Sequence, residues 1–138
     1  MKDSCPFCDF NEDRELKEGK YAFVIFSNPR VMPGHLLVIP KRHMGRLVEL
    51  SDDERKELLD LVIEFQEKIL KRLSKGCDIR QNFRPYVKNS RTHVNHLHFH
   101  LHPRNLNDEV HEKANVYNSL YTGLPEEEKE KLFELLKD

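Results

Sequence analysis

The sequence predicts an α+β protein that combines a small antiparallel sheet, one long helix and a short C-terminal helix. Two observations lead to this fold class. Short apolar runs rich in β-branched and aromatic residues surround one long stretch with helical periodicity. The order strand, strand, long helix, strand, strand is typical of α+β proteins. With 138 residues, the chain suits a single domain built around one core.

The first two strands are predicted at residues 20–27 (KYAFVIFS) and 35–40 (HLLVIP). Turn-forming residues separate them, at Asn28-Pro29 and Pro33-Gly34, and Pro40 ends the second run. The two runs are therefore expected to form an antiparallel hairpin with a longer loop.

A long helix is predicted at residues 51–74. Ser51 and Glu54 have the spacing of a capping box, in which each side chain accepts a backbone N–H of the other residue. Helical spacing then places one set of apolar residues on a single face: Leu58, Leu59, Val62, Phe65, Ile69, Leu70 and Leu73.

Two more strands are predicted near residues 79–87 and 94–102, and a final helix at 125–136 begins with a proline. The segment 105–123 shows no clear pattern. A small sheet leaves edge strands that need cover, and a homodimer is one common way to supply it.

The composition excludes several classes of partner. Lys and Arg number 23 and Asp and Glu number 24, so no basic excess indicates nucleic-acid binding. No apolar stretch reaches the roughly 18 residues of a membrane span, and residues 1–5 lack the apolar core of a signal peptide. A cytoplasmic location is expected, and an anionic ligand would need a local site.

Five of the eight histidines fall within residues 93–102. Because a strand alternates its faces, side chains two residues apart share one face. The pattern predicts that the core takes Leu97, Phe99 and Leu101. The opposite face takes the histidines His96, His98, His100 and His102.

Two chemistries fit this row of histidines equally well. Imidazole is a nucleophile or base near neutral pH, and crowding favours neutral rings ready to attack. One histidine can orient its neighbour through a hydrogen bond, as in a catalytic triad. Alternatively, His96, His98 and His100 could be the ligands of a zinc-dependent hydrolase that activates a water.

The segment HLHFHLHPR at residues 96–104 resembles the signature of the histidine triad (HIT) superfamily. PGHLLVIPK at residues 33–41 is similar to an earlier strand of that family, and the long helix falls where the family has one. The resemblance covers most of the chain and implies a single HIT-like domain over residues 1–138. It also implies that a homodimer forms.

The resemblance implies a mechanism. His98, the middle histidine, would attack the α-phosphorus of a nucleotide and form a covalent nucleotidyl-histidine. His100 would contact the phosphate or assist the leaving group, and His96 would orient the site. Water or phosphate would then release a nucleoside monophosphate, so the enzyme would be a hydrolase or a phosphorylase.

The resemblance also implies the substrates and their pocket. Dinucleoside polyphosphates and nucleoside phosphoramidates are the expected classes. Diadenosine polyphosphates come first, because microbial members with a C-x-x-C terminus favour them. The base and ribose would lie near Ile25, His35 and either Ser27 or Asn28.

The chain departs from the family where many members carry a Gly-Gln-Ser/Thr-like segment. Here the residues are Ser90, Arg91, Thr92 and His93. Thr92 and His93 could still donate to a phosphate, and Arg91 could add a charged fork. His102 replaces a usual aliphatic residue. These departures are the feature that favours a further alternative, a non-catalytic nucleotide-binding module.

A pair of cysteines near the N-terminus, Cys5 and Cys8, indicates metal or redox chemistry in a reducing compartment. Some HIT proteins carry a structural zinc, and the resemblance implies that Cys5, Cys8, His43 and His96 would be its four ligands here. His98 and His100 would then remain for catalysis.

Overall fold

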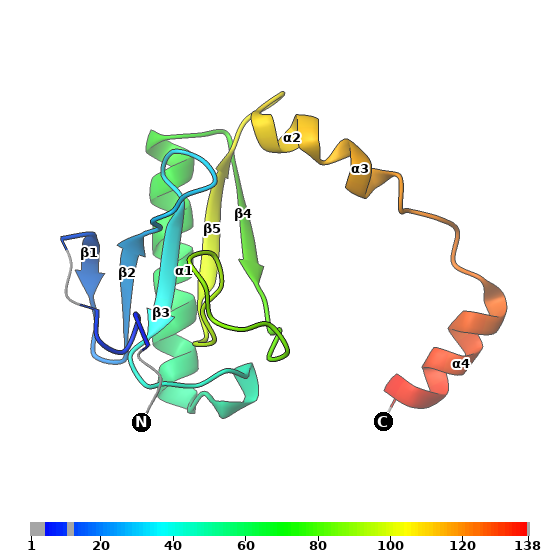
Figure 1. Ribbon diagram of the computed structural model, residues 1–138, viewed down its shortest axis with the longest axis horizontal. Coiled ribbons are helices and arrows are strands. Elements are labelled where there is room, and N and C mark those ends of the chain that lie inside the picture. The colour runs from blue at the N-terminus through cyan, green and yellow to red at the C-terminus, as the bar shows by residue number, and fades with distance from the viewer. Residues whose placement is uncertain (1–4, 11–12, 138) are drawn as a thin grey trace. The chain divides into compact units, whose positions relative to one another are not determined.

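A computed structural model describes residues 5–10 and 13–137. The chain forms two compact units, Met1–Asn105 and Leu106–Asp138. The first unit contains an antiparallel sheet and one long helix, which confirms the predicted α+β class (Figure 1). Residues 1–4, on which the expectation of no signal peptide partly rests, lie outside the described residues.

The sheet has five strands in the order β1-β2-β3-β5-β4, and every neighbouring pair is antiparallel. Helix α1 packs along one face of it (Figure 1). A short 3-10 helix, η1 (Leu47–Glu49), precedes α1 (Asp52–Arg72). The strands are β1 (Glu15–Glu18), β2 (Ala22–Phe26), β3 (Leu36–Pro40), β4 (Gly76–Gln81) and β5 (Phe99–Arg104).

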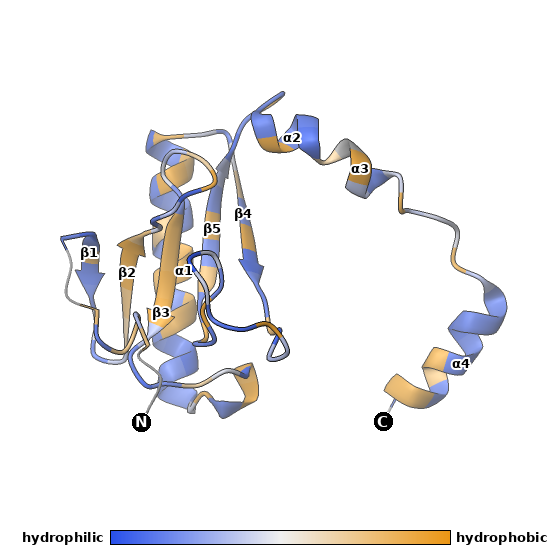
Figure 2. Ribbon diagram, viewed as in Figure 1, coloured by the Kyte–Doolittle hydropathy of each residue, from blue (hydrophilic) through white to orange (hydrophobic). Residues whose placement is uncertain are grey.

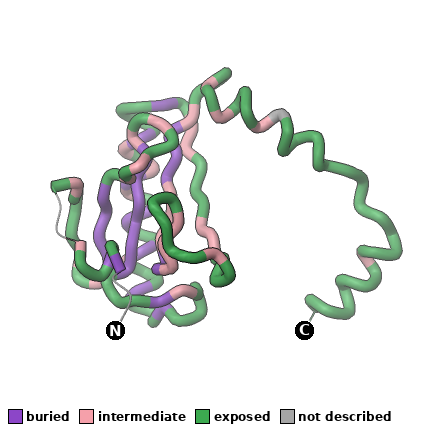
Figure 3. Tube along the Cα trace, in the orientation of Figure 1, coloured by how far each residue is buried: buried purple, intermediate pink, exposed green. Residues whose placement is uncertain are grey.

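The central strands β2 and β3 are apolar and almost entirely buried (Figures 2 and 3). Their side chains join two apolar clusters, one on each face of the sheet. Val24 and Val38 point toward α1 and join the larger cluster. Ile25 and Leu37, one residue along each strand, join a second cluster with Phe7 of the N-terminal segment. This two-sided burial explains why both strands are continuous apolar runs rather than alternating ones.

Helix α1 begins as the sequence predicts. The Glu54 N–H donates to Ser51 Oγ at 3.2 Å, and the Ser51 N–H donates to a Glu54 carboxylate oxygen at 2.8 Å. The predicted apolar face is correct for Leu58, Val62, Phe65 and Ile69, which are buried. It is wrong for Leu59, Leu70 and Leu73, which are exposed because they lie at the margins of the stripe that faces the sheet.

The strand boundaries near the histidines differ from the prediction. β4 ends at Gln81 rather than residue 87, because its partner β5 begins at Phe99, the residue opposite Gln81. β5 begins at Phe99 rather than residue 94. The Asn95 N–H and side-chain amide bond to Asn89 and Val87, which ties this segment into a loop. β1 escapes prediction because its four residues are exposed and mostly charged.

The second unit consists of helices. They are α2 (Glu109–Lys113), α3 (Asn115–Asn118) and α4 (Glu126–Leu136). The helix predicted at 125–136 is confirmed, with Pro125 as its N-cap rather than in its first turn. In the part of the chain that the structure describes, no helix is both long and apolar enough to cross a membrane.

Candidate functional site

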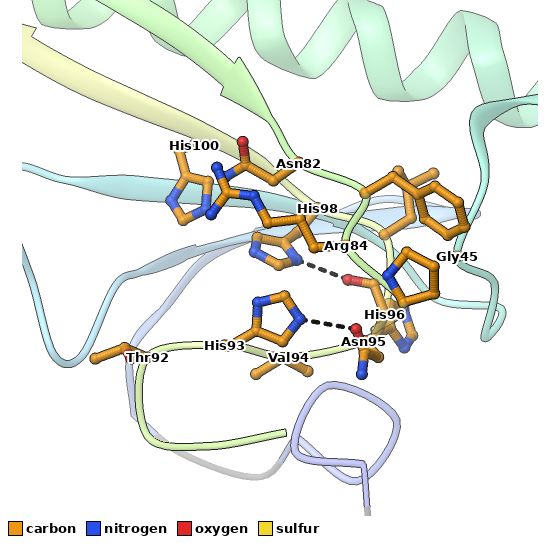
Figure 4. Close-up of a pocket in the computed structure, with 13 residues that line it drawn as sticks. Gly45, Asn82, Arg84, Thr92, His93, Val94, Asn95, His96, His98 and His100 are labelled. Carbon is orange, nitrogen blue, oxygen red and sulfur yellow. Dashed lines mark hydrogen bonds between the residues drawn. The ribbon is translucent and has the colours of Figure 1, made fainter. Parts of the chain in front are cut away.

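Among the described residues, one hydrogen bond holds the ring of His98 and defines its chemistry. Its Nδ1 atom lies 2.6 Å from the backbone carbonyl oxygen of His96 (Figure 4). A carbonyl only accepts, so Nδ1 carries the proton and Nε2 of the neutral ring keeps a free lone pair. Burial lowers the pKa of His98, which favours this neutral form. The ring is therefore arranged as a nucleophile.

Two consecutive hydrogen bonds, from Val31 to His35 and from His35 to His100, fix the ring of His100. The Val31 N–H donates to Nδ1 of His35 at 3.1 Å, so the neutral His35 ring carries its proton on Nε2. That Nε2 lies 2.9 Å from Nδ1 of His100 and donates to it. Burial lowers the pKa of His35 to about 4 and that of His100 to about 3, so both rings are neutral near pH 7.

His100 is thus left with a donor at Nε2, next to the acceptor of His98. The centroids of the two rings lie 4.8 Å apart. A nucleophilic nitrogen beside a fixed N–H donor is the pairing needed to attack a phosphorus atom while stabilising the charge on its oxygens.

A pocket of about 280 Å³ opens beside these two histidines. Its far wall comes from the segment after β4 and from the loop before β5 (Figure 4). The lining residues are Gly45, Asn82, Phe83, Arg84, Pro85, Thr92, His93, Val94, Asn95, His96, Leu97, His98 and His100.

Three polar residues of this pocket, Asn82, Arg84 and Asn95, were missed by the sequence analysis. Asn82 and Arg84 follow the end of β4 but lie within the strand expected at residues 79–87, so the sequence offered no signal that marked them as site residues. In the segment where the chain departs from the HIT signature, Thr92 and His93 line the pocket. Arg91 does not line it, and its side chain is exposed.

The residues expected to hold the base and ribose lie outside the pocket beside His98. Ile25 is fully buried in the cluster beneath the N-terminal segment. The Ser27 hydroxyl donates to the carbonyl oxygen of Pro29 at 2.8 Å, and Asn28 is exposed. None of the three lines the pocket beside His98.

Cys5, Cys8, His43 and His96 come together as one group, in which the four donor atoms lie within 4.8 Å of one another. Cys5 Sγ lies 3.3 Å from His96 Nδ1, and Cys8 Sγ lies 3.3 Å from His43 Nδ1. The two Nδ1 atoms are 3.1 Å apart. Zinc bonds of about 2.0 to 2.3 Å in a tetrahedron require ligand separations of roughly 3.3 to 3.8 Å, so the group fits a zinc ion.

The protonation of His96 also suits a metal ligand. Its Nε2 lies 2.8 Å from the carbonyl oxygen of Pro40 and must donate to it, which leaves the lone pair of Nδ1 facing the two thiols. Burial lowers the pKa of His96 to about 4, so the ring is neutral and able to coordinate. Two thiols and two imidazoles are a donor set typical of structural zinc.

His102 lies on the side of His100 away from His98, with the ring centroids of His100 and His102 5.6 Å apart. Its Nε2 is buried and has no hydrogen-bond partner among the described residues. The rings of His98, His100 and His102 thus follow one another along the chain, as the period of two predicts. His98 directly precedes β5, and His96, two residues earlier, takes part in the cysteine group.

Residues 11–107 match the family model described as HIT domain. The matched part contains the whole sheet, α1 and the histidines from His35 to His102, whereas Cys5 and Cys8 precede it.

Two relatives are similar to this chain in sequence. An uncharacterised HIT-like protein of Saccharolobus solfataricus is 30% identical over 72% of this chain and 73% of its own length. An adenosine 5'-monophosphoramidase of Schizosaccharomyces pombe is 30% identical over 73% of this chain and 74% of its own. The fold is also similar to the crystal structure of a zinc-bound histidine triad family protein of Mycobacterium smegmatis. That structure shares 20% identity and a TM-score of 0.66, with 91% of this chain and 86% of the other covered.

Proposed function

Because this chain belongs to the HIT family, we propose that it is a nucleotide hydrolase or transferase whose nucleophile is His98. One observation carries the proposal. The hydrogen bond from Nδ1 of His98 to the carbonyl oxygen of His96 leaves Nε2 free at the wall of the pocket. The bond is to the main chain, so the tautomer does not depend on another side chain's ionisation.

The first chemical step forms a bond between Nε2 of His98 and the α-phosphorus. The bond to the leaving group breaks, and its electron pair leaves with that group. Nε2–H of His100, fixed by His35, donates to an oxygen on the reacting phosphate. In the second step water attacks the phosphorus and loses a proton to a nearby base. The P–N bond breaks, and its electron pair returns to Nε2 of His98.

The substrate class follows from this chemistry and from a relative. The attack requires a nucleotide with a leaving group on its α-phosphate. The relative from Schizosaccharomyces pombe is named for phosphoramidate cleavage, which supports a nucleoside phosphoramidate. The resemblance of the cysteine pair to that of microbial HIT enzymes supports a diadenosine polyphosphate instead, and the two substrates are tested side by side.

We further propose that Cys5, Cys8, His43 and His96 hold a structural zinc ion. When bound, zinc would join the N-terminal segment to the loop after β3 and to the segment before β5. Among the residues that the structure describes, the groups that could hold a metal are Cys5–Cys8–His43–His96 and His35–His100–His102, and neither includes His98. That distribution favours the nucleophile over the alternative of a zinc hydrolase with His96, His98 and His100 as ligands.

The experiment is an intact-mass and product assay of the wild type and His98→Ala. The substrates are adenosine 5'-phosphoramidate and diadenosine tetraphosphate, with and without inorganic phosphate. We expect an adenylyl adduct on the wild type, and a loss of kcat on the order of 10⁴-fold or more in His98→Ala. Faster turnover with phosphate would identify a phosphorylase.

His111→Ala is the control, because His111 is exposed and belongs to the second unit. Adenylate binding without turnover or adduct in the wild type would contradict the proposal and favour a binding module. Turnover without adduct, lost on chelation, would favour the zinc hydrolase.

The proposed enzyme is a cytoplasmic homodimer. An apolar groove supports self-association, and the residues that line it are Leu47, Val48, Leu50, Arg55, Leu58, Leu59, Val62 and Phe99. Light scattering at micromolar concentration checks the dimer, and a single-chain mass would contradict it. Cell fractionation checks the location.

A further inference from the structure

We infer that His93 is a further catalytic residue, the base that activates water to hydrolyse the nucleotidyl-His98 intermediate. The inference rests on the proposed function. It adds a role for one of the residues at which the chain departs from the HIT signature.

The neighbours of His93 determine which of its nitrogens carries the proton. The side-chain amide of Asn95 donates through Nδ2 to the carbonyl oxygen of Val87 at 2.8 Å, which turns Oδ1 of Asn95 toward His93. Oδ1 lies 2.8 Å from Nε2 of His93 and can only accept (Figure 4). Nε2 is therefore protonated, and Nδ1 of the neutral ring has a free lone pair.

The loop holds this pair of residues firmly. The Asn95 N–H donates to Oδ1 of Asn89 at 2.7 Å, and the Ser90 N–H donates to the carbonyl oxygen of His93 at 2.8 Å. A histidine with one nitrogen bonded to a fixed acceptor and the other free is the arrangement by which enzymes orient a general base.

His93 also lines the pocket into which His98 opens. Its ring faces the ring of His98 from the opposite loop (Figure 4). Water attacks phosphorus in line with the bond that breaks, so it approaches from the side opposite Nε2 of His98. His93 is partly exposed, so solvent reaches it directly.

The step balances without any other reactant. The oxygen of water bonds to phosphorus while its proton passes to Nδ1 of His93. The P–N bond to His98 breaks, and its electron pair returns to Nε2. The nucleoside monophosphate departs, and the His93 imidazolium then releases its proton to solvent.

The test compares wild type, His93→Gln and His111→Gln in rapid-quench reactions with adenosine 5'-phosphoramidate or diadenosine tetraphosphate, whichever the wild type turns over. Intact mass follows the adenylyl adduct over time. In His93→Gln we expect adduct formation within about threefold of the wild type and adduct hydrolysis slowed about 10²-fold. The adduct should therefore accumulate toward one per chain, while His111→Gln should behave as the wild type.

Formation of the adduct itself demonstrates that His93→Gln folds, and His93→Asn serves as a second variant if it does not. Adduct hydrolysis at the wild-type rate in these variants would overturn the inference but leave the proposed function intact. Slower formation with unchanged hydrolysis would also overturn it. The absence of any adduct in the wild type would instead overturn the proposed function.

Discussion

The carbonyl oxygen of His96 lies 2.6 Å from Nδ1 of His98, while the side chain of His96 belongs to the Cys5–Cys8–His43 group. One residue thus links the proposed zinc site to the proposed nucleophile, through its ring on one side and its main chain on the other. Any change that releases the His96 ring should disturb the hydrogen bond that sets the tautomer of His98.

We therefore expect that loss of zinc affects both stability and catalysis. Cys8→Ser, or chelation of the wild type, removes the zinc ion, which binds the folded state and so stabilises it. A site saturated about 1,000-fold above its dissociation constant contributes about 4 kcal/mol. For a chain of this size that lowers the melting temperature by roughly 10 to 15 °C. Calorimetry and metal analysis check this, with one zinc expected per chain.

Cys77→Ser is the matched control, because Cys77 lies in β4 and is not part of the metal-binding group. It should retain one zinc and the sensitivity of the melting temperature to chelation. If purified wild type holds no zinc and chelation leaves its melting temperature unchanged, the zinc site is wrong.

The hydrogen bond between His35 and His100 leads to a second expectation. His35→Leu removes the donor to Nδ1 of His100, and the His100 ring then loses the bond that keeps its proton on Nε2. We expect kcat to fall about 10²-fold with adduct formation as the slowed step. His35→Gln should recover part of this loss, because its amide can still donate to His100. Equal losses in both variants, with unchanged melting temperatures, would contradict this role.

Elements that bury apolar residues are the ones that the sequence predicts well. β2, β3 and α1 each appear within two residues of the expected ends, because continuous apolar runs and a capping box leave few alternatives. The spacing of Cys5 and Cys8 indicates metal chemistry from the sequence alone, whereas His43 and His96 were expected as further zinc ligands from the resemblance to the HIT superfamily.

The far wall of the pocket could not be predicted in the same way. Asn82, Arg84 and Asn95 carry no periodic signal, and their positions depend on how the loop between β4 and β5 folds back. That path is set by side-chain hydrogen bonds, such as those that Asn95 makes with Val87 and Asn89. Local bonds of this kind compete with strand pairing, which is also why β5 begins later than expected.

Glu54 couples the stability of α1 to pH. Hydrogen bonds from Arg42, at 3.1 and 2.8 Å, and then from the Ser51 N–H hold the pKa of Glu54 at about 2, below its ordinary 4.5. Because the pKa is lowered in the folded protein, the contribution is present above about pH 4.5 and is lost as the pH falls toward 2.

Glu54→Gln should therefore destabilise the protein by about 1 to 2 kcal/mol at pH 7 and by much less near pH 2. Urea unfolding at several pH values measures this. Glu67→Gln is the control on the same helix, since Glu67 is exposed and pairs only weakly with Lys71 at 3.7 Å. A destabilisation by Glu54→Gln that does not change between pH 7 and pH 2 would contradict the linkage.

The ribose contact is the last expectation. The Ser27 hydroxyl already donates to the carbonyl oxygen of Pro29. The side-chain amide of Asn28 is exposed and can offer a donor and an acceptor to the two hydroxyls of a ribose. We expect Asn28→Ala to raise KM about tenfold with little change in kcat, and Ser27→Ala to change neither by more than about twofold.

A deoxyribose substrate separates a direct contact from an indirect effect. With wild type, removal of the 2'-hydroxyl should raise KM by a factor similar to that of Asn28→Ala. With Asn28→Ala the same removal should have little further effect, because the partner is already gone. If removal of the 2'-hydroxyl raises KM by the same factor in the wild type and in Asn28→Ala, Asn28 does not bind the hydroxyl. If Ser27→Ala instead raises KM, and removal of the 2'-hydroxyl then has no further effect on KM, the ribose contact belongs to Ser27.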